Sequence, residues 1–436
     1  MLMNTLLNKL TNVEVFLTII FLVAIIGLIF PYGFPLFGPV VFLFFILFLI
    51  KGKLKIKLNI GILILFICAL QYIWGMLLTK GVIYDRNVAE LLNIIVIALV
   101  VIILGNLNNK SYKYFVIYVK KYGVCIVSIF AAIGIYKLIL RLNNHFIEYF
   151  YTESGHYPNG TSLVEDYNMF ALGILAILLF SIGSLVIQKR IGNAIYYLCT
   201  TFILIITATL AGSRRAWIAL AIIFVFFSVY LLIITFRKLS QILVRLKLKI
   251  TGQNLILAAC IFAIILIIPM GINNVGQEND NPRVFQSMQN RFQSLGKDHI
   301  FNSFKPRIMR WEYGMQLVEE GELWQVVFGQ GFGYLSKFSY EFNTSGEDYP
   351  HNPIISGLLY AGAFGALMLL FLLILPAYYL FKYYYAYGWE FMALYCLSLL
   401  FLFMSSNSIF SNDLFMTIIV IVFSAKPNRK RVFLRM

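Results

Sequence analysis

Charged residues are scarce in this chain of 436 residues: they make up 12% of it, whereas 61% of the residues are hydrophobic. So few charges could not solvate the surface of a globular protein, which excludes the water-soluble class. In lipid, backbone N–H and C=O groups must be satisfied within the protein, and stretches of about 20 apolar residues achieve this as helices. We therefore expect an all-α polytopic membrane protein.

Several motifs that define other functions are also missing. The chain has no P-loop, no His-Glu-x-x-His zinc pattern and no Gly-x-Ser-x-Gly elbow, and its predicted outer loops have no Asp-x-Asp pair for a metal-bound nucleotide sugar. These absences argue against ATP-driven transport and metalloprotease activity, and we expect neither a metal nor a cofactor. A disulfide framework is not expected either, because all five cysteines fall in apolar segments: Cys68, Cys125, Cys199, Cys260 and Cys396.

Hydrophobic stretches long enough to cross a bilayer recur along the whole chain. No cleavage site of a signal peptide stands out, so the first stretch is interpreted as a retained span. We predict about twelve spans, with a large loop between the ninth and the tenth. They lie near residues 14–30, 34–50, 58–78, 88–105, 123–141, 167–187, 194–212, 216–236, 254–272, 354–381, 390–406 and 413–425.

The net charge of +16 follows the membrane, so a nucleic-acid partner is not expected. Five basic clusters without any Asp or Glu mark alternate loops. By the positive-inside rule these loops are cytoplasmic, which places both termini inside the cell. The clusters lie at residues 51–57, 110–121, 189–190, 237–249 and 426–435.

This orientation places three segments outside the cytoplasm: residues 142–166, a short turn at residues 213–215, and residues 273–353. The last is long for a simple connection, and such loops are usually functional or disordered. Its sequence is not typical of disorder. We therefore divide the chain into spans one to nine (1–272), a large periplasmic loop (273–353), and the last three spans with a basic cytoplasmic tail (354–436).

Within the large loop, apolar residues recur at helical spacing between 307 and 322. Ile308, Trp311, Met315 and Val318 form this stripe. The pattern predicts an amphipathic helix. Such a helix either lies on the membrane surface or packs against the rest of the domain, and the spacing fits both.

Arg214 and Arg215 lie between two hydrophobic stretches, on the predicted outer side, where the positive-inside rule gives no reason for basic residues. A topological role or contact with lipid headgroups is the simpler explanation. The functional hypothesis is an anion site, because guanidinium groups keep their charge and match phosphate oxygens.

His351 is one of only four histidines and lies where the large loop re-enters the membrane. A lone histidine is more often structural than catalytic. Its ionisation near neutral pH nevertheless suits proton transfer at a membrane boundary, and Pro350 and Pro353 would stiffen its backbone.

Arg307 and Arg310 begin the amphipathic stretch, either as a solvated helix face or as added positive charge for an anionic substrate. Gly329, Gly331 and Gly333 resemble a nucleotide-binding loop only superficially, because no strand–helix unit surrounds them. A flexible turn is the better interpretation of these glycines.

These motifs combine into a resemblance. Residues 213–220 (SRRAWIAL) resemble the SRGAWLAL signature of the bacterial O-antigen ligase and polymerase superfamily. Ten residues separate His351 from Gly362, which is similar to the second landmark of that family. Arg307 is followed four residues later by Trp311 and further along by a Gly-x-Gly-x-Gly turn, and this arrangement is similar to the third landmark of the family.

The landmarks run in the expected order from about residue 160 to residue 365, whereas the first 150 residues resemble the family only as generic spans. One position departs from the pattern: Arg215 stands where the family has glycine. Alignment makes Arg214 the counterpart of the family's arginine, yet Arg215 can share or replace its role.

The resemblance implies a GT-C-like fold and a metal-independent glycosyltransferase of the bacterial inner membrane. Such enzymes move a glycan from undecaprenyl pyrophosphate to a sugar hydroxyl at the periplasmic face, on lipid A–core for a ligase or on a lipid-linked repeat unit for a polymerase. It implies that the pyrophosphate is bound by Arg214, Arg215, Arg307 and Arg310. His351 would then take the proton of the acceptor hydroxyl.

Other functions remain open. The His-to-Gly spacing slightly favours a ligase over a polymerase. A flippase or transporter of lipid-linked oligosaccharide would need ionisable residues deep within the spans, and Glu90 is the nearest to this description. A structural scaffold would leave the grouped arginines and histidine unexplained.

Overall fold

The computed structural model describes residues 10–30, 36–79, 84–143, 145, 147–151, 155, 157–188, 190–225, 227–228, 297–344, 347–383, 387–403 and 408–425. These residues form helices joined by turns and loops, and they include no strand. The prediction of an all-α membrane protein is confirmed by six helices that are long and apolar enough to cross a bilayer. They are α4 (Ile60–Leu78), α5 (Asp85–Leu104), the continuous helix Asn109–Leu142, α8 (Tyr167–Ile187), α9 (Ile191–Leu210) and α16 (Pro353–Lys382).

The helix Asn109–Leu142 is made of α6 (Asn109–Tyr118), a π-helical turn (Val119–Gly123) and α7 (Val124–Leu142). The shorter apolar helices α2 (Val13–Ile29), α3 (Phe37–Ile50), α18 (Trp389–Leu402) and α19 (Asp413–Ser424) complete the described part of the bundle. The first seven and the last three predicted spans therefore coincide with helices. The eighth is described as a helix at 214–225 and 227–228, which we name the Arg214 helix, and the ninth, 254–272, lies outside the described residues.

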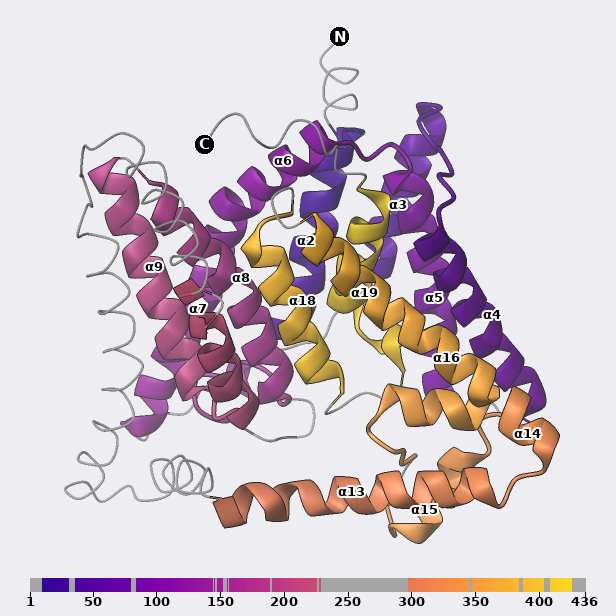
Figure 1. Cartoon of the computed structure of the whole chain (residues 1–436). Helices are drawn as coiled ribbons and strands as arrows, with labels where there is room; N and C mark the ends of the chain where they lie inside the picture. The colour runs from indigo at the N-terminus through magenta and orange to yellow at the C-terminus, as the bar shows by residue number, and fades with distance from the viewer. Residues whose placement is uncertain are drawn as a thin grey trace, which may run out of the picture.

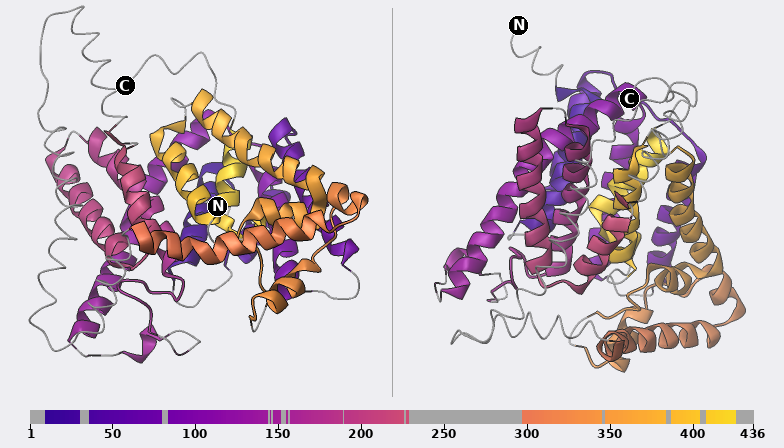
Figure 2. Two further views of the ribbon diagram at one scale, coloured as in Figure 1. Left: turned by 60° about the horizontal axis from the view of Figure 1, so that its bottom comes forward. Right: turned by 60° about the vertical axis from the view of Figure 1, so that its left-hand side comes forward.

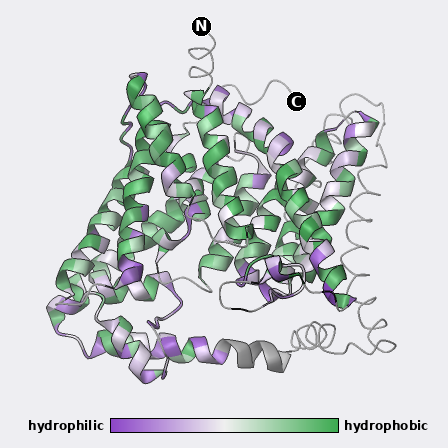
Figure 3. Ribbon diagram, turned by 180° about the vertical axis from the view of Figure 1, so that it is seen from behind, coloured by the Kyte–Doolittle hydropathy of each residue, from purple (hydrophilic) through white to green (hydrophobic). Residues whose placement is uncertain are grey.

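The bundle is built around α8, which is buried over nearly its whole length. Phe180 of α8 makes edge contacts with the rings of Phe21 and Phe391, at centroid distances of 5.8 and 5.7 Å. Figure 1 shows α7, α8 and α9 on one side of the bundle and α3, α4, α5 and α16 on the other, with α18 and α19 between them. Hydrophobic residues cover most of the length of these helices, and more hydrophilic residues lie along α13 (Figure 3).

Three further helices lie across one end of the bundle: α13 (Lys297–Glu319), α14 (Leu323–Phe328) and α15 (Tyr334–Glu341), as Figures 1 and 2 show. At the opposite end, Lys53 Nζ donates to Thr11 Oγ1 at 3.1 Å, and Asn106 Nδ2 donates to the carbonyl of Lys53. The basic clusters at 51–57 and 110–121 thus share the end away from α13, as their alternation predicts. The compartment that each end faces stays a prediction.

The predicted helix around residues 307–322 is present as part of α13, and its apolar stripe is divided: Trp311 and Val318 are half-buried, and Val318 packs against the hydrophobic core. Ile308 and Met315 are 37% and 41% exposed, whereas Leu317 is buried. Gly314 lies on the inner face, where a Cβ atom would approach Ile355 of α16 to 2.8 Å. The close approach of α13 to α16 occurs at this small residue, so the packed face includes Gly314 and Leu317, while Ile308 and Met315 of the predicted stripe stay exposed.

Residues 157–166, in the predicted outer loop 142–166, are fixed to the bundle by a buried lysine. Lys137 of α7 is fully buried, and its Nζ donates to the carbonyls of Pro158, at 2.8 Å, and Ser162. Thr161 Oγ1 donates to the carbonyl of Thr207 in α9 at 2.6 Å. These bonds hold the start of α8 against α7 and α9, beside the Arg214 helix.

Buried ionisable residues are more numerous than the sequence indicated. Besides Glu90, Lys137 lies inside α7, and Glu390 at the start of α18 forms a 2.7 Å ion pair with Lys120. Lys120 and Lys137 both have partners within the bundle, as the cost of a charge in lipid requires.

Candidate functional site

Arg214 and Arg215 lie in the first turn of a helix. We predicted a turn at residues 213–215, and this is wrong, because the turn is at residues 211–213 and the helix begins at Arg214. Ser213 is the reason: its Oγ accepts from the backbone N–H of Ala216 at 3.3 Å and donates to Asn168 Oδ1 at 2.8 Å. The N-terminus of a helix carries a partial positive charge, which adds to that of the two arginines.

The two arginines face different surroundings. Arg215 is buried, with 8% of its surface exposed, whereas Arg214 is half-buried. Burial and the neighbouring Arg307 lower the pKa of Arg215 to about 10, and Asp166 and Tyr349 oppose this shift. Arg215 therefore keeps its charge at neutral pH and lies among the other candidate residues.

Arg307 reaches the same place from α13. Burial lowers the pKa of Arg307, as do the charges of Arg214 and Arg310, while Tyr167 opposes the shift. Arg307 therefore interacts electrostatically with Arg214 and Arg215, which come from a separate segment, and with Arg310 of its own helix. Guanidinium groups that repel one another in a partly buried place favour the binding of an anion between them.

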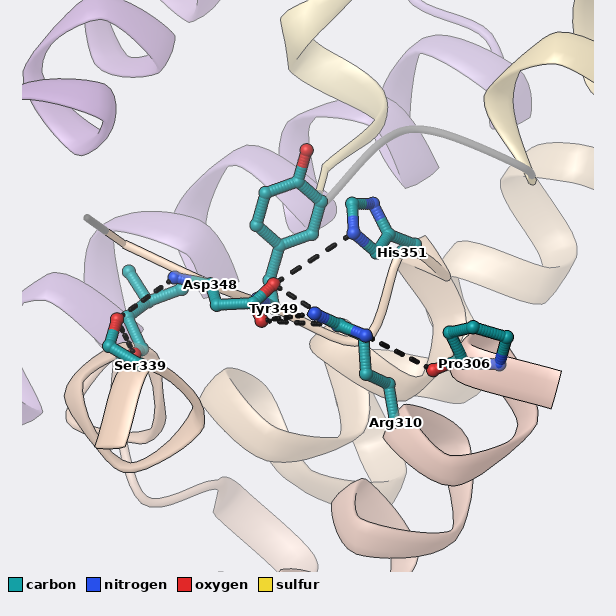
Figure 4. Close-up of polar contacts among 7 residues, drawn as sticks. Pro306, Arg310, Ser339, Asp348, Tyr349 and His351 are labelled. Atoms are coloured by element: carbon teal, nitrogen blue, oxygen red, sulfur yellow. Dashed lines mark hydrogen bonds and ion pairs between the residues drawn. The ribbon is translucent and has the colours of Figure 1, made fainter. Parts of the chain in front are cut away.

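Arg310 has a different environment, which Figure 4 shows. Its Nη2 and Nε donate to Asp348 Oδ2 at 2.7 and 3.1 Å, and its Nη1 donates to the carbonyl of Pro306 at 3.2 Å. Asp348 is 5% exposed. Its carboxylate matches the charge of Arg310, so this arginine fixes the chain before α16 to α13. The sequence analysis missed Asp348, and no spacing rule links it to Arg310.

His351 lies immediately before α16, beside this ion pair. Its Nε2 is 3.8 Å from Asp348 Oδ1, and its ring centroid is 4.3 Å from that of Tyr349 (Figure 4). The φ angle of His351 is 55°, a left-handed conformation that costs a non-glycine residue about 1–3 kcal/mol and often marks a functional position.

The sequence after His351 explains why the helix starts there. Asn352 Oδ1 accepts from the backbone N–H groups of Ile354 and Ile355, at 3.0 and 3.4 Å, and Pro353 occupies the first helical position. Asparagine is a favourable cap, and proline at this position loses no helical hydrogen bond. His351 is therefore held in place at the N-terminus of α16, at the end of the bundle where α13 lies.

Arg86 of α5 is a second residue that the sequence analysis missed. Its Cζ lies 4.3 Å from the ring centroid of Tyr349, on the ring face. Burial raises the pKa of Tyr349, and the nearby Arg86 opposes the shift. A signal was present: Arg86 precedes the predicted span 88–105 at its outer end, where the positive-inside rule does not call for an arginine.

Two of the three glycines after α14 are tightly packed, which the expectation of a simple turn did not include. Gly329 and Gly331 have φ angles of 91° and 74°, and Cβ atoms there would lie 2.3 Å from the carbonyl oxygen of Tyr360 and 2.9 Å from that of Gly75. Gly362, with φ 70°, makes a kink in α16 that receives the end of α14. The ten residues between His351 and Gly362 are the cap Asn352 and the nine residues of α16 before this kink.

Replacing Asp348 by asparagine should destabilise the protein by about 3 kcal/mol, because it leaves the partly buried charge of Arg310 without its counterion. We expect a lower unfolding temperature in detergent and a loss of activity. The double variant Arg310→Gln/Asp348→Asn should recover part of the stability. If the free-energy loss of the double variant equals the sum of the losses in Arg310→Gln and Asp348→Asn, the ion pair does not carry this effect.

Among the described residues, no three His, Cys, Asp or Glu side chains lie close enough together to hold a metal ion. The fold and the site define a helical membrane protein with an arginine cluster and a histidine gathered at one end of the bundle. No protein-family model, curated protein or solved structure matches the chain.

Proposed function

We propose that this protein is a metal-independent glycosyltransferase of the bacterial inner membrane, with a GT-C-like fold. It would move a glycan from undecaprenyl pyrophosphate to a sugar hydroxyl during assembly of surface polysaccharide, as an O-antigen ligase or repeat-unit polymerase. The observation that carries the proposal is the approach of Arg215 to Arg307 and to Tyr349, which neighbours His351. Arg215, Arg307 and His351 lie in the three sequence segments that resemble landmarks of that superfamily.

The charges fit the donor. Arg215 and Arg307, with Arg214 beside them, would hold the pyrophosphate at the N-terminus of the Arg214 helix. As the bond between the sugar C1 and the phosphate oxygen breaks, its electron pair stays on the pyrophosphate, and the guanidinium groups stabilise that charge. The hydrocarbon chain of the donor would remain in the bilayer.

The proton of the acceptor hydroxyl would go to the imidazole of His351 while the acceptor oxygen bonds to C1. The carboxylate of Asp348, 3.8 Å from Nε2, would stabilise the imidazolium that forms. Arg310 then acts through Asp348, which it holds in place, rather than on the pyrophosphate.

A flippase is the alternative, and the buried charges do not favour it. Lys137 is bonded to two carbonyls and Glu390 is paired with Lys120, so neither marks a route along which charges exchange. Glu90 is considered below.

The proposal is tested by His351→Ala in a strain that lacks the native gene. We expect long-chain polysaccharide to be lost, and transfer by the purified protein in nanodiscs to fall by roughly 10²–10⁴-fold. His145→Ala, at an exposed histidine, is the control. Normal polysaccharide with His351→Ala at normal protein abundance would exclude a catalytic histidine. In the deletion strain, one repeat unit on the core indicates a lost polymerase, and bare core with lipid-linked polymer indicates a lost ligase.

A further inference from the structure

Glu90 is a buried carboxylate that forms no ion pair with a lysine or arginine among the described residues. It lies in α5, which is apolar and long enough to cross a membrane, and it is 2% exposed. Neither of its carboxylate oxygens has a hydrogen-bond partner, and the same holds for the buried Nη1 of Arg86, one turn away on the same helix face. Lys137 and Lys120, by contrast, are bonded within the bundle. Buried polar groups without partners are rare and need an explanation.

The surroundings of Glu90 are polar and aromatic. The hydroxyls of Tyr72 and Ser408 are close enough to interact with its carboxylate, as is the charge of Arg86. The Tyr72 hydroxyl also donates to Asn87 Oδ1 at 3.2 Å. A carboxylate, a guanidinium, two hydroxyls and an aromatic ring therefore gather between α4, α5 and the chain before α19.

This cluster is connected to the candidate base. Arg86 lies 4.3 Å from the ring centroid of Tyr349, and the Tyr349 ring lies 4.3 Å from that of His351. Arg86 belongs to α5, which lies with α3 and α4 on one side of the bundle (Figure 1), whereas Arg215 follows Ser213, whose hydroxyl donates to Asn168 of α8 on the other side. Tyr349 interacts with both arginines. Contacts from His351 through Tyr349 to Arg86 therefore connect the candidate base to a second group of polar side chains.

The charge balance decides which substrate this group fits. The cluster around Arg215 has an excess of positive charge, which suits a pyrophosphate. Near Arg86 the neighbouring polar side chains are acidic or neutral, so this group lacks the excess of positive charge that an anion needs. Neighbouring sugar hydroxyls can donate to a carboxylate and accept from a guanidinium, and the apolar face of a sugar ring packs on tyrosine.

We infer that Arg86 and Glu90 form a subsite for the hydroxyl groups of the acceptor sugar, next to His351. This inference rests on the proposed transferase function and adds to it the place where the acceptor binds. The sugar would satisfy the carboxylate and guanidinium atoms that have no partner, and the hydroxyl that reacts would face the histidine.

The test separates the two substrates. Initial rates are measured with purified protein in nanodiscs, varying either the undecaprenyl-pyrophosphate glycan or the acceptor that the wild-type protein elongates, lipid A–core or a lipid-linked repeat unit. In Glu90→Gln and Arg86→Lys we expect the KM for acceptor to rise about tenfold or more, because each change weakens a hydrogen bond to a charged group. The KM for donor should stay within about twofold of wild type. Asp85→Asn, at an exposed carboxylate on the same turn, should change neither value.

Three results would overturn the subsite: an unchanged KM for acceptor in both variants, an equal rise for both substrates, or a loss confined to kcat, which would assign Glu90 to the chemical step. Thermal unfolding of each variant is measured together with the rates. When Glu90→Gln does not fold, the KM values of the conservative variant Arg86→Lys test the subsite. A wild-type protein without transfer to either acceptor would instead refute the proposed function.

Discussion

Arg215→Lys should lower the rate of glycan transfer by roughly 10²–10³-fold, while Arg214→Lys should lower it by less than about tenfold. Arg215 is buried beside Arg307, and its planar guanidinium can bind two phosphate oxygens at once. Lysine keeps the charge but loses this geometry. Arg214 is half-buried, so water screens its charge more strongly. The two variants therefore make a matched comparison: both arginines carry the same charge, lie in the first turn of the same helix and are replaced by lysine.

The measurement is the single-turnover rate of transfer from the undecaprenyl-pyrophosphate donor by protein in nanodiscs, with donor binding measured separately. The unfolding temperatures of the two variants should agree within a few degrees. A larger loss for Arg214→Lys would show that the family's aligned position, rather than the buried one, contacts the pyrophosphate.

Alanine at Gly362 or Gly329 should prevent the protein from accumulating in a folded form. Both residues have left-handed φ angles, of 70° and 91°, which cost alanine about 1–3 kcal/mol. The added Cβ would also come within 2.3 Å of backbone atoms, of Val327 at Gly362 and of Tyr360 at Gly329. Backbone atoms cannot move aside as a flexible side chain can, so we expect at least a further 1–3 kcal/mol, about the cost of overpacking a core.

Gly333 provides the control in the same turn, because a Cβ atom there has no neighbour within 4 Å. Size-exclusion profiles and unfolding temperatures of the three alanine variants in detergent measure the effect. Gly333→Ala should behave as wild type. If Gly329→Ala and Gly362→Ala were as stable as Gly333→Ala, the packing of α14 against the kink of α16 would not stabilise this end of the protein.

The candidate site was only partly predictable. His351, Arg215 and Arg307 were found from sequence landmarks, and the structure brings Arg215 and Arg307 together with Tyr349, whose ring contacts His351. Arg310 was grouped with Arg307 because the two lie three residues apart on one helix. Their surroundings differ, because Arg310 forms an ion pair with the carboxylate of Asp348, whereas Arg307 is not part of that ion pair.

The sequence alone determined the fold class, and short-range hydrogen bonds set the first residue of two helices at the site. Long apolar stretches leave the backbone no other way to satisfy its hydrogen bonds in lipid, and Ser213 and Asn352 cap helices through atoms within three residues of themselves. The tertiary structure decided which arginine faces inward, which carboxylate holds Arg310, and that Arg86 stacks on Tyr349 beside His351. These contacts join residues far apart in the chain, and local propensities contain no information about them, because they depend on how whole helices pack against one another.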